Sequence, residues 1–466
     1  MIDVLREALG GERAWLVGGA LRDRLLGRPT PDLDVVVDGD VRGAARRLGR
    51  GLGGASFELS DQFGAWRVVA RETGWQVDIT PLQGGSLEAD LAARDLTVNA
   101  MAEPLSGGEI VDPHGGREDL AARRLRMVSP GVFAADPLRT LRVARLACEL
   151  GFAVDPATAA AARAHAAGLA GISPERVFAE LKRIVVADAA LDGLARMDEL
   201  GLTAVVLPEL DTLRGVGQNP YHHRDVHGHT LEVLGAAIAL ERDPAATLGA
   251  DLAPAVRALL DEPLADGLTR GGGLRFGALL HDAAKPQTRV ELGDGRIGFP
   301  GHDVQGAALA RDVLARLRAS ERLRAHVAAL TRHHLDLGFL VHQAPLDRRT
   351  VYRYLRDTAP VTADVTLLSV ADRLATRGRN ADAAISRHLA LAREMIAVAL
   401  KDRAAAPVAP LVRGDDLARA LGIAPGPRLG ELLEAIAEAR YAGEVATADE
   451  AVSLARGLLD ADGGGS

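Results

Sequence analysis

Cysteine is almost absent from this chain of 466 residues, because Cys148 is the only one. A single thiol excludes an intrachain disulfide and indicates a reducing compartment. No apolar run approaches the ~18 residues that a membrane span needs. The first residues, MIDVLREALG, also lack the basic and apolar regions of a secretion signal. We therefore expect a cytoplasmic protein without a membrane partner.

An excess of positive charge is missing as well. The formal net charge is −8, which argues against nonspecific coating of nucleic acid. The segment from Arg117 to Arg145 differs from the rest, because it holds seven arginines and three acidic residues. A local basic stripe is sufficient for binding phosphates. The alternative is a set of exposed arginines on helix faces.

The pattern of apolar residues predicts an α+β chain of about three domains. Apolar runs near 15–18, 34–37, 66–70 and 76–79 indicate strands, and a helix is expected around 41–48. After Pro137 the pattern is helical, with breaks at Gly151, Asp155-Pro156, Ser173-Pro174 and Pro208. Loops are expected at 260–273, 293–301 and 403–410.

The most informative segment is WLVGGALRDRLLGRPTPDLDVVV, residues 15–37. A strand directs residues i and i+2 to one face, so Asp32 and Asp34 would lie about 7 Å apart along the chain. Two such carboxylates can share two magnesium ions, which serve an in-line displacement at a phosphate. Backbone N–H groups at Gly18 and Gly19 can approach a triphosphate, and Arg22 offers a planar fork for its oxygens. The alternative is a pair of solvated surface aspartates.

With GG, LRD and DLD in this order, the segment resembles the class II nucleotidyltransferases, the family of CCA-adding tRNA enzymes and bacterial poly(A) polymerases. The resemblance implies a polymerase-β-like head with a mixed sheet, an all-α neck, an HD-containing body and a helical tail. We place these parts at 1–125, 126–190, 191–385 and 386–466. It also implies Mg²⁺ in the head, with tRNA, CTP and ATP as partners, and it adds Asp23 to the nucleotide-binding residues.

Two further segments of the head resemble family motifs. ARDLTVNAMA, residues 93–102, is similar to RRDFTINAMA, which implies that Arg94, Asp95 and Asn99 contact the nucleotide. Ala93 replaces the first arginine of that motif. VDPHGGREDL, residues 111–120, is adequately explained as a turn. Asp78 is either a third carboxylate on a neighbouring strand or has no role in the site.

The neck sequence AADPLRTLRVARLACELGF resembles the family pattern EDPLRLLRAARFAAELGF, with Ala135 in place of the glutamate. On a helix, Asp136, Arg139 and Arg142 would share one face. Cytosine and adenine both present an amine beside an acceptor, whereas uracil and guanine would leave buried groups unpaired, at about 1–3 kcal/mol each. Asp136 and Arg139 can therefore act as a protein template. Arg142 and Arg145 would belong to the same nucleotide-binding site, where they either support this geometry or touch phosphate. The alternative is a helix cap followed by solvated arginines.

The next neck segment, SPERVFAEL, matches a further family motif. Ser173 would cap a helix with Pro174 at its first position, and Glu175 and Arg176 would brace the neck.

Several histidine-containing segments downstream together resemble an HD domain: HHRDVHGHTLEVL, LLHDAAKP, GHDVQGA, the pair at 333–334, and ADRLATRG. The implied metal ligands are His229, His281, Asp282 and Asp372. Imidazole and carboxylate suit a divalent cation such as Mg²⁺, Mn²⁺ or Ni²⁺. Lys285 would hold a phosphate, and His302 with either His333 or His334 would complete a second metal site. The domain is either a phosphohydrolase or a scaffold.

The segment LVRGDDLARALGIAPGPRLGELLEAI, residues 411–436, resembles the family's tail, in which Arg428 would contact tRNA. Two alternatives remain beside a tRNA nucleotidyltransferase. A poly(A) polymerase commonly carries an arginine-rich stretch where this chain has SDQFGAWRVVA, and a phosphohydrolase would use its head only to bind RNA. Whether all of CCA, CC or A is added depends on a flexible loop, which we place within 52–66.

Overall fold

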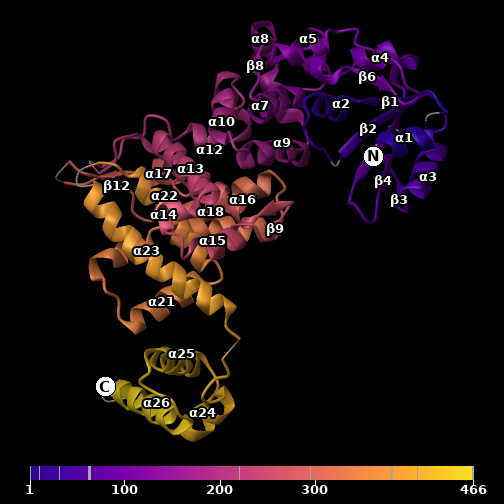
Figure 1. The fold of residues 1–466 in the computed structure, drawn as a ribbon. Coiled ribbons are helices and arrows are strands. Elements are labelled where there is room, and N and C mark those ends of the chain that lie inside the picture. Colours follow the sequence, from indigo (N-terminus) through magenta and orange to yellow (C-terminus); the bar gives the residue numbers. More distant parts are fainter. Residues whose placement is uncertain are drawn as a thin grey trace. The chain divides into compact units, whose positions relative to one another are not determined.

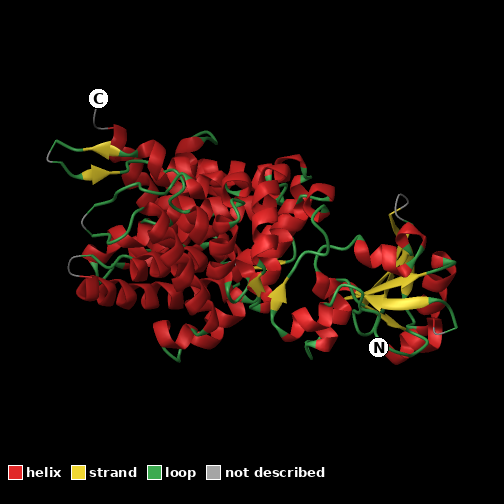
Figure 2. Ribbon diagram, turned by 90° about the horizontal axis from the view of Figure 1, so that it is seen from above, coloured by secondary structure: helices red, strands yellow, loops and turns green. Residues whose placement is uncertain are grey.

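The computed structural model describes residues 2–9, 11–30, 32–60, 64–219, 221–293, 295–378, 381–406 and 408–463. The chain divides into two compact units, Met1–Pro208 and Glu209–Ser466 (Figure 1). A mixed sheet lies in the first unit, and helices make up nearly all of the second (Figure 2). The expected α+β class is confirmed. The finer division into head, neck, body and tail stays a prediction.

Six strands form the sheet of the first unit in the order β3-β4-β5-β2-β1-β6. They are β1 (Ala14–Val17), β2 (Asp32–Val37), β3 (Ala55–Ser60), β4 (Ala65–Val69), β5 (Gln76–Pro81) and β6 (Ala102–Pro104). Only β2 and β5 run parallel, and this pair places Asp34 opposite Asp78. The neighbouring pairs are antiparallel, so the sheet is mixed.

The four strands expected from apolar runs are present, and α3 (Val41–Gly51) covers the expected helix. β3 and β6 were not expected. β3 is the edge strand, and its side chains at Phe57 and Leu59 are exposed, so it lacks a buried apolar face. The loop expected within 52–66 consists of the turn before β3, the strand itself and residues 61–63, which lie outside the described residues.

The helices after the sheet begin and end where the punctuating residues predict. α7 (Leu138–Leu150) stops at Gly151, which adopts φ +66°. α8 (Pro156–His165) starts after Asp155, whose side chain accepts a hydrogen bond from the N–H of Thr158. α9 (Pro174–Val186) starts after Ser173, but the Ser173 side chain makes no capping hydrogen bond. α10 (Ala190–Glu199) completes this group and packs against α7 and α9.

The second unit is a helical bundle in which α16 (Arg270–Leu280) is buried along its whole length. Its neighbours are α13 (Val226–Arg242), α19 (Glu321–His333) and α22 (Thr362–Ala375). The expected loop at 260–273 is therefore wrong over most of its length. β9 (Pro263–Ala265) and β10 (Leu268–Thr269) pair there, and residues 270–273 form the first turn of α16. A Cβ at Gly271 would lie 2.8 Å from Glu241 Oε1, and one at Gly273 would lie 2.7 Å from Leu264 Cδ2. The glycines are needed for close packing, not for flexibility.

The C-terminal helices α24 (Gly414–Leu421), α25 (Pro427–Ala442) and α26 (Ala448–Gly463) enclose a small apolar core of their own. α25 also packs against α21 (Arg348–Thr358). Among the described residues, no helix has both the length and the apolar character needed to cross a membrane.

Candidate functional site

The first candidate site starts where β1 turns into α2 (Gly18–Leu25). Val17 is the N-cap of α2 and offers no side-chain hydrogen bond, so no capping side chain occupies the first N–H groups of the helix. Free N–H groups at a helix N-terminus favour a bound anion. Gly18 has φ +68°, and a Cβ there would lie 3.1 Å from both Arg94 Nη1 and Asp34 Oδ2. Glycine is thus required for the approach of both side chains.

Asp32 and Asp34 lie on the same exposed face of β2, as alternate strand residues must. The surrounding protein raises the pKa of Asp34 by desolvation, while the nearby Arg94 acts in the opposite direction. Asp78 lies beside Asp34 on β5, but its carboxylate receives two hydrogen bonds from Arg67, at 2.7 and 2.8 Å. Asp78 is therefore engaged with Arg67 in this structure.

The buried carboxylate of Asp95 links the ARDLTVNAMA segment to helix α7. Asp95 accepts hydrogen bonds from its neighbour's N–H at 2.8 Å, from Asn99 Nδ2 at 3.0 Å and from Arg142 Nε at 2.7 Å. Burial opposes ionisation of Asp95, but Arg142 and the amide donors hold its pKa well below the usual range. The charge of Asp95 in turn raises the pKa of Arg142. The pair fixes one arginine of α7 against the ARDLTVNAMA segment.

Asp136 does not lie on α7, contrary to the expectation of one helix face. Its backbone is extended, at φ −148° and ψ 98°, because a residue before proline disfavours the helical region and Pro137 follows. Asp136 Oδ2 accepts a hydrogen bond from Arg176 Nη2 at 2.7 Å. Arg139 Nη2 donates to the carbonyl of Ala93 at 2.8 Å. Arg176 of α9 thus holds Asp136, and the carbonyl of Ala93 holds Arg139.

These side chains converge on one cavity of about 490 Å³. Nine of the expected residues line it, namely Gly18, Gly19, Asp34, Arg94, Asp95, Asn99, Asp136, Arg139 and Arg142. Thr80, Gln83, Asp90 and Arg176 also line it and were not expected to bind nucleotide. Asp90 accepts two hydrogen bonds from Arg94, and its spacing of four residues on a helix is a signal that the sequence offered. The lining combines anion-binding groups with carboxylates.

Four expected residues lie outside that lining. Asp32 flanks it on β2. Arg22 pairs with Asp23 at 2.8 Å, and its Nη1 donates to Asn99 Oδ1 at 2.7 Å, so its fork is already occupied by protein groups. Arg145 is buried and forms ion pairs with Glu149 and Glu180. Arg22 and Arg145 therefore brace the elements around the cavity.

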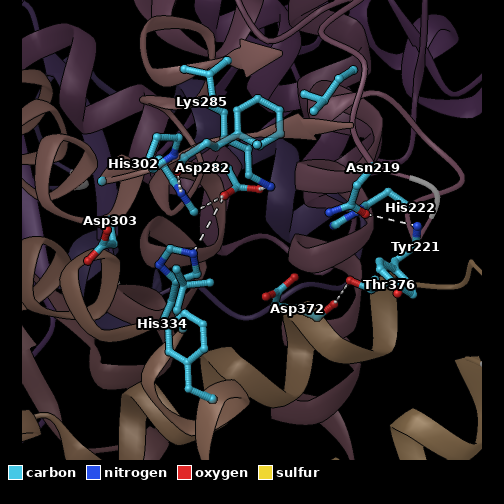
Figure 3. A pocket seen from close by; sticks show the side chains of 18 of the residues that line it. Asn219, Tyr221, His222, Asp282, Lys285, His302, Asp303, His334, Asp372 and Thr376 are labelled. Atoms are coloured by element: carbon cyan, nitrogen blue, oxygen red, sulfur yellow. Dashed lines mark hydrogen bonds and ion pairs between the residues drawn. The ribbon is translucent and has the colours of Figure 1, made fainter. Parts of the chain in front are cut away.

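A second candidate site lies in the helical unit, around the buried carboxylate of Asp282 (Figure 3). His229 lies on α13, His281 and Asp282 follow α16, and Asp372 lies on α22. His229 Nε2 is 3.0 Å from Asp372 Oδ1 and 3.7 Å from Asp282 Oδ2, and His281 Nε2 is 3.2 Å from Asp282 Oδ2. The four expected ligands are thus close to one another.

Two more histidines approach the other oxygen of Asp282. His302 Nε2, at the start of α18 (His302–Arg316), is 3.4 Å from Asp282 Oδ1, and His334 Nε2 is 3.8 Å from it. The ligand atoms of Asp282, His302 and His334 lie within 4.8 Å of one another. His333 instead pairs with Asp336 at 2.8 Å. Of the two candidates at 333–334, His334 is the one in the cluster.

Backbone hydrogen bonds orient the rings of three histidines so that their Nε2 atoms face this cluster. The Nδ1 atoms of His281, His302 and His334 each donate to a backbone carbonyl, at 2.8, 2.7 and 2.7 Å. In a neutral ring, Nε2 is then an acceptor, which is the arrangement that metal-ligating histidines use. Burial lowers the pKa of His334 to about 4, so that ring is neutral at pH 7. The buried Nε2 atoms of His281 and His302 have no hydrogen-bond partner among the described residues, so these residues fit a divalent cation.

Lys285 is also part of this site. Its Nζ lies 2.7 Å from Asp282 Oδ2 and 2.7 Å from Gln218 Oε1. Burial raises the pKa of Asp282. The positive charges of His281 and Lys285 overcome this effect and hold the pKa well below its usual range. The site opens into a cavity of about 690 Å³ whose lining includes His222 and Phe299, two residues that the sequence analysis did not single out.

Comparisons with known proteins match three family models to the chain. A poly A polymerase head domain covers residues 14–82 and 67–126, a probable RNA and SrmB-binding site of polymerase A covers 151–213, and an HD domain covers 226–377. The nucleotidyltransferase and HD families are metal-dependent, which agrees with the carboxylate and histidine groups described above.

Curated relatives match over most of their length. An A-adding tRNA nucleotidyltransferase of Deinococcus radiodurans is 39% identical, covering 94% of both chains. A CC-adding tRNA nucleotidyltransferase of Thermus thermophilus is 35% identical, covering 94% of this chain and 92% of the relative. A multifunctional CCA protein of Halorhodospira halophila is 38% identical over 68% of this chain and 72% of its own.

Solved structures share the fold at lower identity. The Thermotoga maritima CCA-adding enzyme complexed with tRNA has a TM-score of 0.61 at 18% identity, and covers 98% of this chain and 95% of its own. A CCA-adding enzyme in an apo form has a TM-score of 0.64 at 20% identity, with 98% and 93% coverage. The architecture of the whole chain therefore recurs in known structures.

Proposed function

This chain belongs to the family of CCA-adding tRNA nucleotidyltransferases, and we propose that it extends the tRNA 3′ end with C and A nucleotides from CTP and ATP, without a nucleic-acid template. The product is CCA or a part of it. One observation carries the proposal: a single cavity joins Asp34, the N-terminus of α2 and the side chains of Asp136, Arg139 and Arg142. Chemistry at a phosphate and selection of a base thus take place in adjoining parts of one cavity.

Asp32 and Asp34 would hold Mg²⁺, because carboxylate oxygens are its preferred ligands and both side chains lie on the open face of β2. Magnesium held there would lower the pKa of the attacking hydroxyl and neutralise charge on the leaving group. The 3′-oxygen of the RNA forms a bond to the α-phosphorus, and the bond from that phosphorus to the bridging oxygen breaks, releasing pyrophosphate. The free N–H groups of α2 and the guanidinium of Arg94 hold the triphosphate beside Asp34.

Base selection falls to Asp136 and Arg139. The Asp136 carboxylate accepts a hydrogen bond from the exocyclic amine of cytosine or adenine, and Arg139 donates to the neighbouring ring acceptor. Uracil and guanine present a carbonyl to Asp136, which leaves two acceptors facing each other and costs about 1–3 kcal/mol. Arg142, fixed by Asp95, adds positive charge to the cavity wall.

Nucleotide addition to defined tRNA ends tests this function. Three transcripts, ending before CCA, after C or after CC, are incubated with Mg²⁺ and labelled CTP or ATP, and products are resolved at single-nucleotide length. Three added residues on the first transcript identify a full CCA-adding enzyme. Arrest after CC, or addition only to the transcript ending in CC, identifies a CC-adding or an A-adding enzyme. An open-ended ladder of A, or no addition to any transcript, would overturn the proposal.

We infer a second activity, metal-dependent hydrolysis of phosphoesters, for the cluster around Asp282. The Nε2 atoms of His281 and His302 face this buried carboxylate without a hydrogen-bond partner among the described residues. This favours the hydrolytic activity, because a purely structural cluster would satisfy these atoms by hydrogen bonds. His229, His281, Asp282 and Asp372 would hold one divalent ion, Mg²⁺, Mn²⁺ or Ni²⁺, and His302 with His334 would complete a second site around Asp282. Lys285 would hold a phosphate oxygen.

The test is release of phosphate from 3′-phosphate nucleotides, or ring opening of 2′,3′-cyclic nucleotides, with each metal in turn. Metal-stimulated turnover that His281→Ala abolishes is expected. Absence of turnover with all three metals would leave the helical unit as a scaffold.

A further inference from the structure

A second, smaller cavity adjoins the one around Asp282. It measures about 230 Å³. The two cavities share Asp372 and Arg373 on α22, Thr376 just after that helix, and His334, Leu335 and Phe339. We call it the side cavity. Nothing in the proposed nucleotide transfer or phosphoester hydrolysis uses it.

One wall of the side cavity is a single face of α22. Ser369, Asp372 and Arg373 are spaced as i, i+3 and i+4, so they lie side by side on that helix, and Thr376 follows directly after its end. Asp372 is the only carboxylate in the lining, and it already pairs with His229 at 3.0 Å. Arg373 Nη2 donates to the carbonyl of Thr376 at 2.6 Å, while its buried Nε has no hydrogen-bond partner among the described residues.

The facing wall comes from α23 (Ala381–Ala404), which packs along α22. Ala384, Arg387 and His388 line the cavity with spacings of three and four residues. Arg387 is exposed, and no hydrogen bond or ion pair joins its guanidinium to another residue of the described ranges. His388 is neutral at pH 7, because burial lowers its pKa to about 4, and its Nε2 lies 3.1 Å from Ser369 Oγ. The side cavity thus has two guanidinium groups and no free carboxylate.

Phe339 lies at the junction of the two cavities and is 67% exposed. A large aromatic ring that stays exposed beside both cavities offers a stacking surface for a nucleobase, which is worth about 1–3 kcal/mol. The ring therefore favours a nucleotide over a simple phosphate ester.

We propose that the side cavity binds a second phosphate of a nucleotide ligand whose first phosphate lies at the Asp282 cluster. Arg373 and Arg387 would donate charge-assisted hydrogen bonds to it. The ligand class is nucleotides with two separated phosphates, either a nucleoside 3′,5′-bisphosphate or an RNA end in which a 3′-phosphate follows a phosphodiester. The position of the first phosphate rests on the proposed hydrolytic function, whereas the binding of the second does not.

Equilibrium binding to the full chain in EDTA tests the proposal without turnover. Adenosine 3′,5′-bisphosphate is titrated calorimetrically against 3′-AMP and 5′-AMP. The dinucleotide CpC with a 3′-phosphate, titrated against CpC without it, forms a second arm. We expect at least one bisphosphorylated ligand to bind about tenfold more tightly than its monophosphorylated counterpart, the gain of one charge-assisted hydrogen bond. Gain in the first arm alone identifies the mononucleotide, and gain in the second alone identifies the RNA end.

The matched variants are Arg387→Gln in the side cavity and Arg322→Gln, an exposed arginine of α19 that lines neither cavity. Arg387→Gln removes the tenfold gain, Arg373→Gln reduces it, and Arg322→Gln keeps it. Binding in the N-terminal unit is common to all variants and cancels in the comparison. Equal affinities for mono- and bisphosphates, or equal losses in Arg387→Gln and Arg322→Gln, would overturn the proposal. If phosphohydrolase activity is absent but the Arg387-dependent gain remains, the side cavity stands and only the hydrolytic function falls.

Discussion

At the scale of single residues, the cavity that contains Asp34 depends on the close approach of two side chains to Gly18. Gly18 has φ +68°, which L side chains rarely adopt, and Arg94 and Asp34 both approach the position of its missing Cβ. Gly27 provides a natural comparison, because it has the same φ of +68° and no heavy atom within 4 Å of that position. Substitutions at these two glycines therefore distinguish the effect of backbone strain from the effect of contact with the site.

Gly18→Ala should reduce kcat/KM for nucleotide addition by about tenfold or more, since displacing Arg94 weakens a charge-assisted hydrogen bond to phosphate. Gly27→Ala should leave it within about twofold. Both variants should lose a similar stability, about 1 kcal/mol, from the left-handed backbone. Steady-state kinetics and thermal unfolding measure the two effects, and equal kinetic losses in both variants would count against the geometry.

Arginines on α7 divide into those that line the cavity and one that braces it. Arg145→Leu leaves the buried Glu180 with only its longer contact to Arg142, at 3.9 Å, so the free energy of unfolding should fall by about 3 kcal/mol while KM for CTP or ATP stays unchanged. Arg139→Leu should do the reverse, raising KM about tenfold with little change in stability. Thermal denaturation and initial rates distinguish the two, and a raised KM in Arg145→Leu would place that residue in contact with nucleotide.

The sequence predicted much of the site because its residues are local to motifs. Gly18, Gly19 and Asp34 follow from one strand-helix-strand segment, and Gly151 and Pro156 mark helix ends by their own backbone preferences. The prediction for Asp136 failed for a local reason, because Pro137 keeps it off the helix. Elsewhere it failed where packing decides the outcome: the glycines of α16 serve close contact, and Arg176 reaches Asp136 from 40 residues away. Neither the conformational propensity of single residues nor the periodicity of apolar residues reveals such long-range pairs.

At the scale of elements, α21 and α25 meet through charged and aromatic side chains. Glu438 accepts hydrogen bonds from Arg349 at 3.1 Å and from Arg353 at 2.6 Å, whereas Glu434 accepts one from Arg356 at 2.9 Å. Tyr352 and Tyr441 also contact each other across the pair. Ion pairs at a surface contribute little singly and are screened by salt.

Glu438→Gln should therefore speed amide hydrogen exchange over 427–442 more than Glu434→Gln does, because it removes a charge that two arginines share. One molar NaCl should produce a similar change in the unaltered chain. Hydrogen exchange with mass spectrometry measures both. Identical exchange in the two variants would show that the aromatic and apolar contacts alone hold α25 in place.

At the scale of the whole molecule, several buried histidines link stability to pH. Burial lowers the pKa of His222 to about 3, and those of His326, His334 and His388 to about 4. The unfolded chain binds these protons near pH 6.5, so their contribution is complete above that pH and is lost as pH falls toward 4. His281 acts oppositely, because Asp282 raises its pKa despite burial. Four histidines with a lowered pKa outweigh one with a raised pKa, so the free energy of unfolding should decrease as the pH falls from about 6.5 to 4.

His326→Leu should reduce this pH dependence, because it removes one of the four groups and replaces it with a side chain of similar volume. Thermal unfolding in EDTA at pH 7.5 and pH 5 measures the slope. The control is His342→Leu, which replaces an exposed histidine, and its slope should match that of the unaltered chain. An unchanged slope in His326→Leu would contradict the assignment.

Nucleotide transfer at Asp32 and Asp34 is tested by single-nucleotide extension of the three tRNA transcripts with the double variant Asp32→Ala/Asp34→Ala. The control is Asp38→Ala, an exposed residue directly after the same strand. The double variant should add no nucleotide, while phosphate release at the Asp282 cluster and addition by Asp38→Ala persist. Nucleotide addition by the double variant would contradict the account.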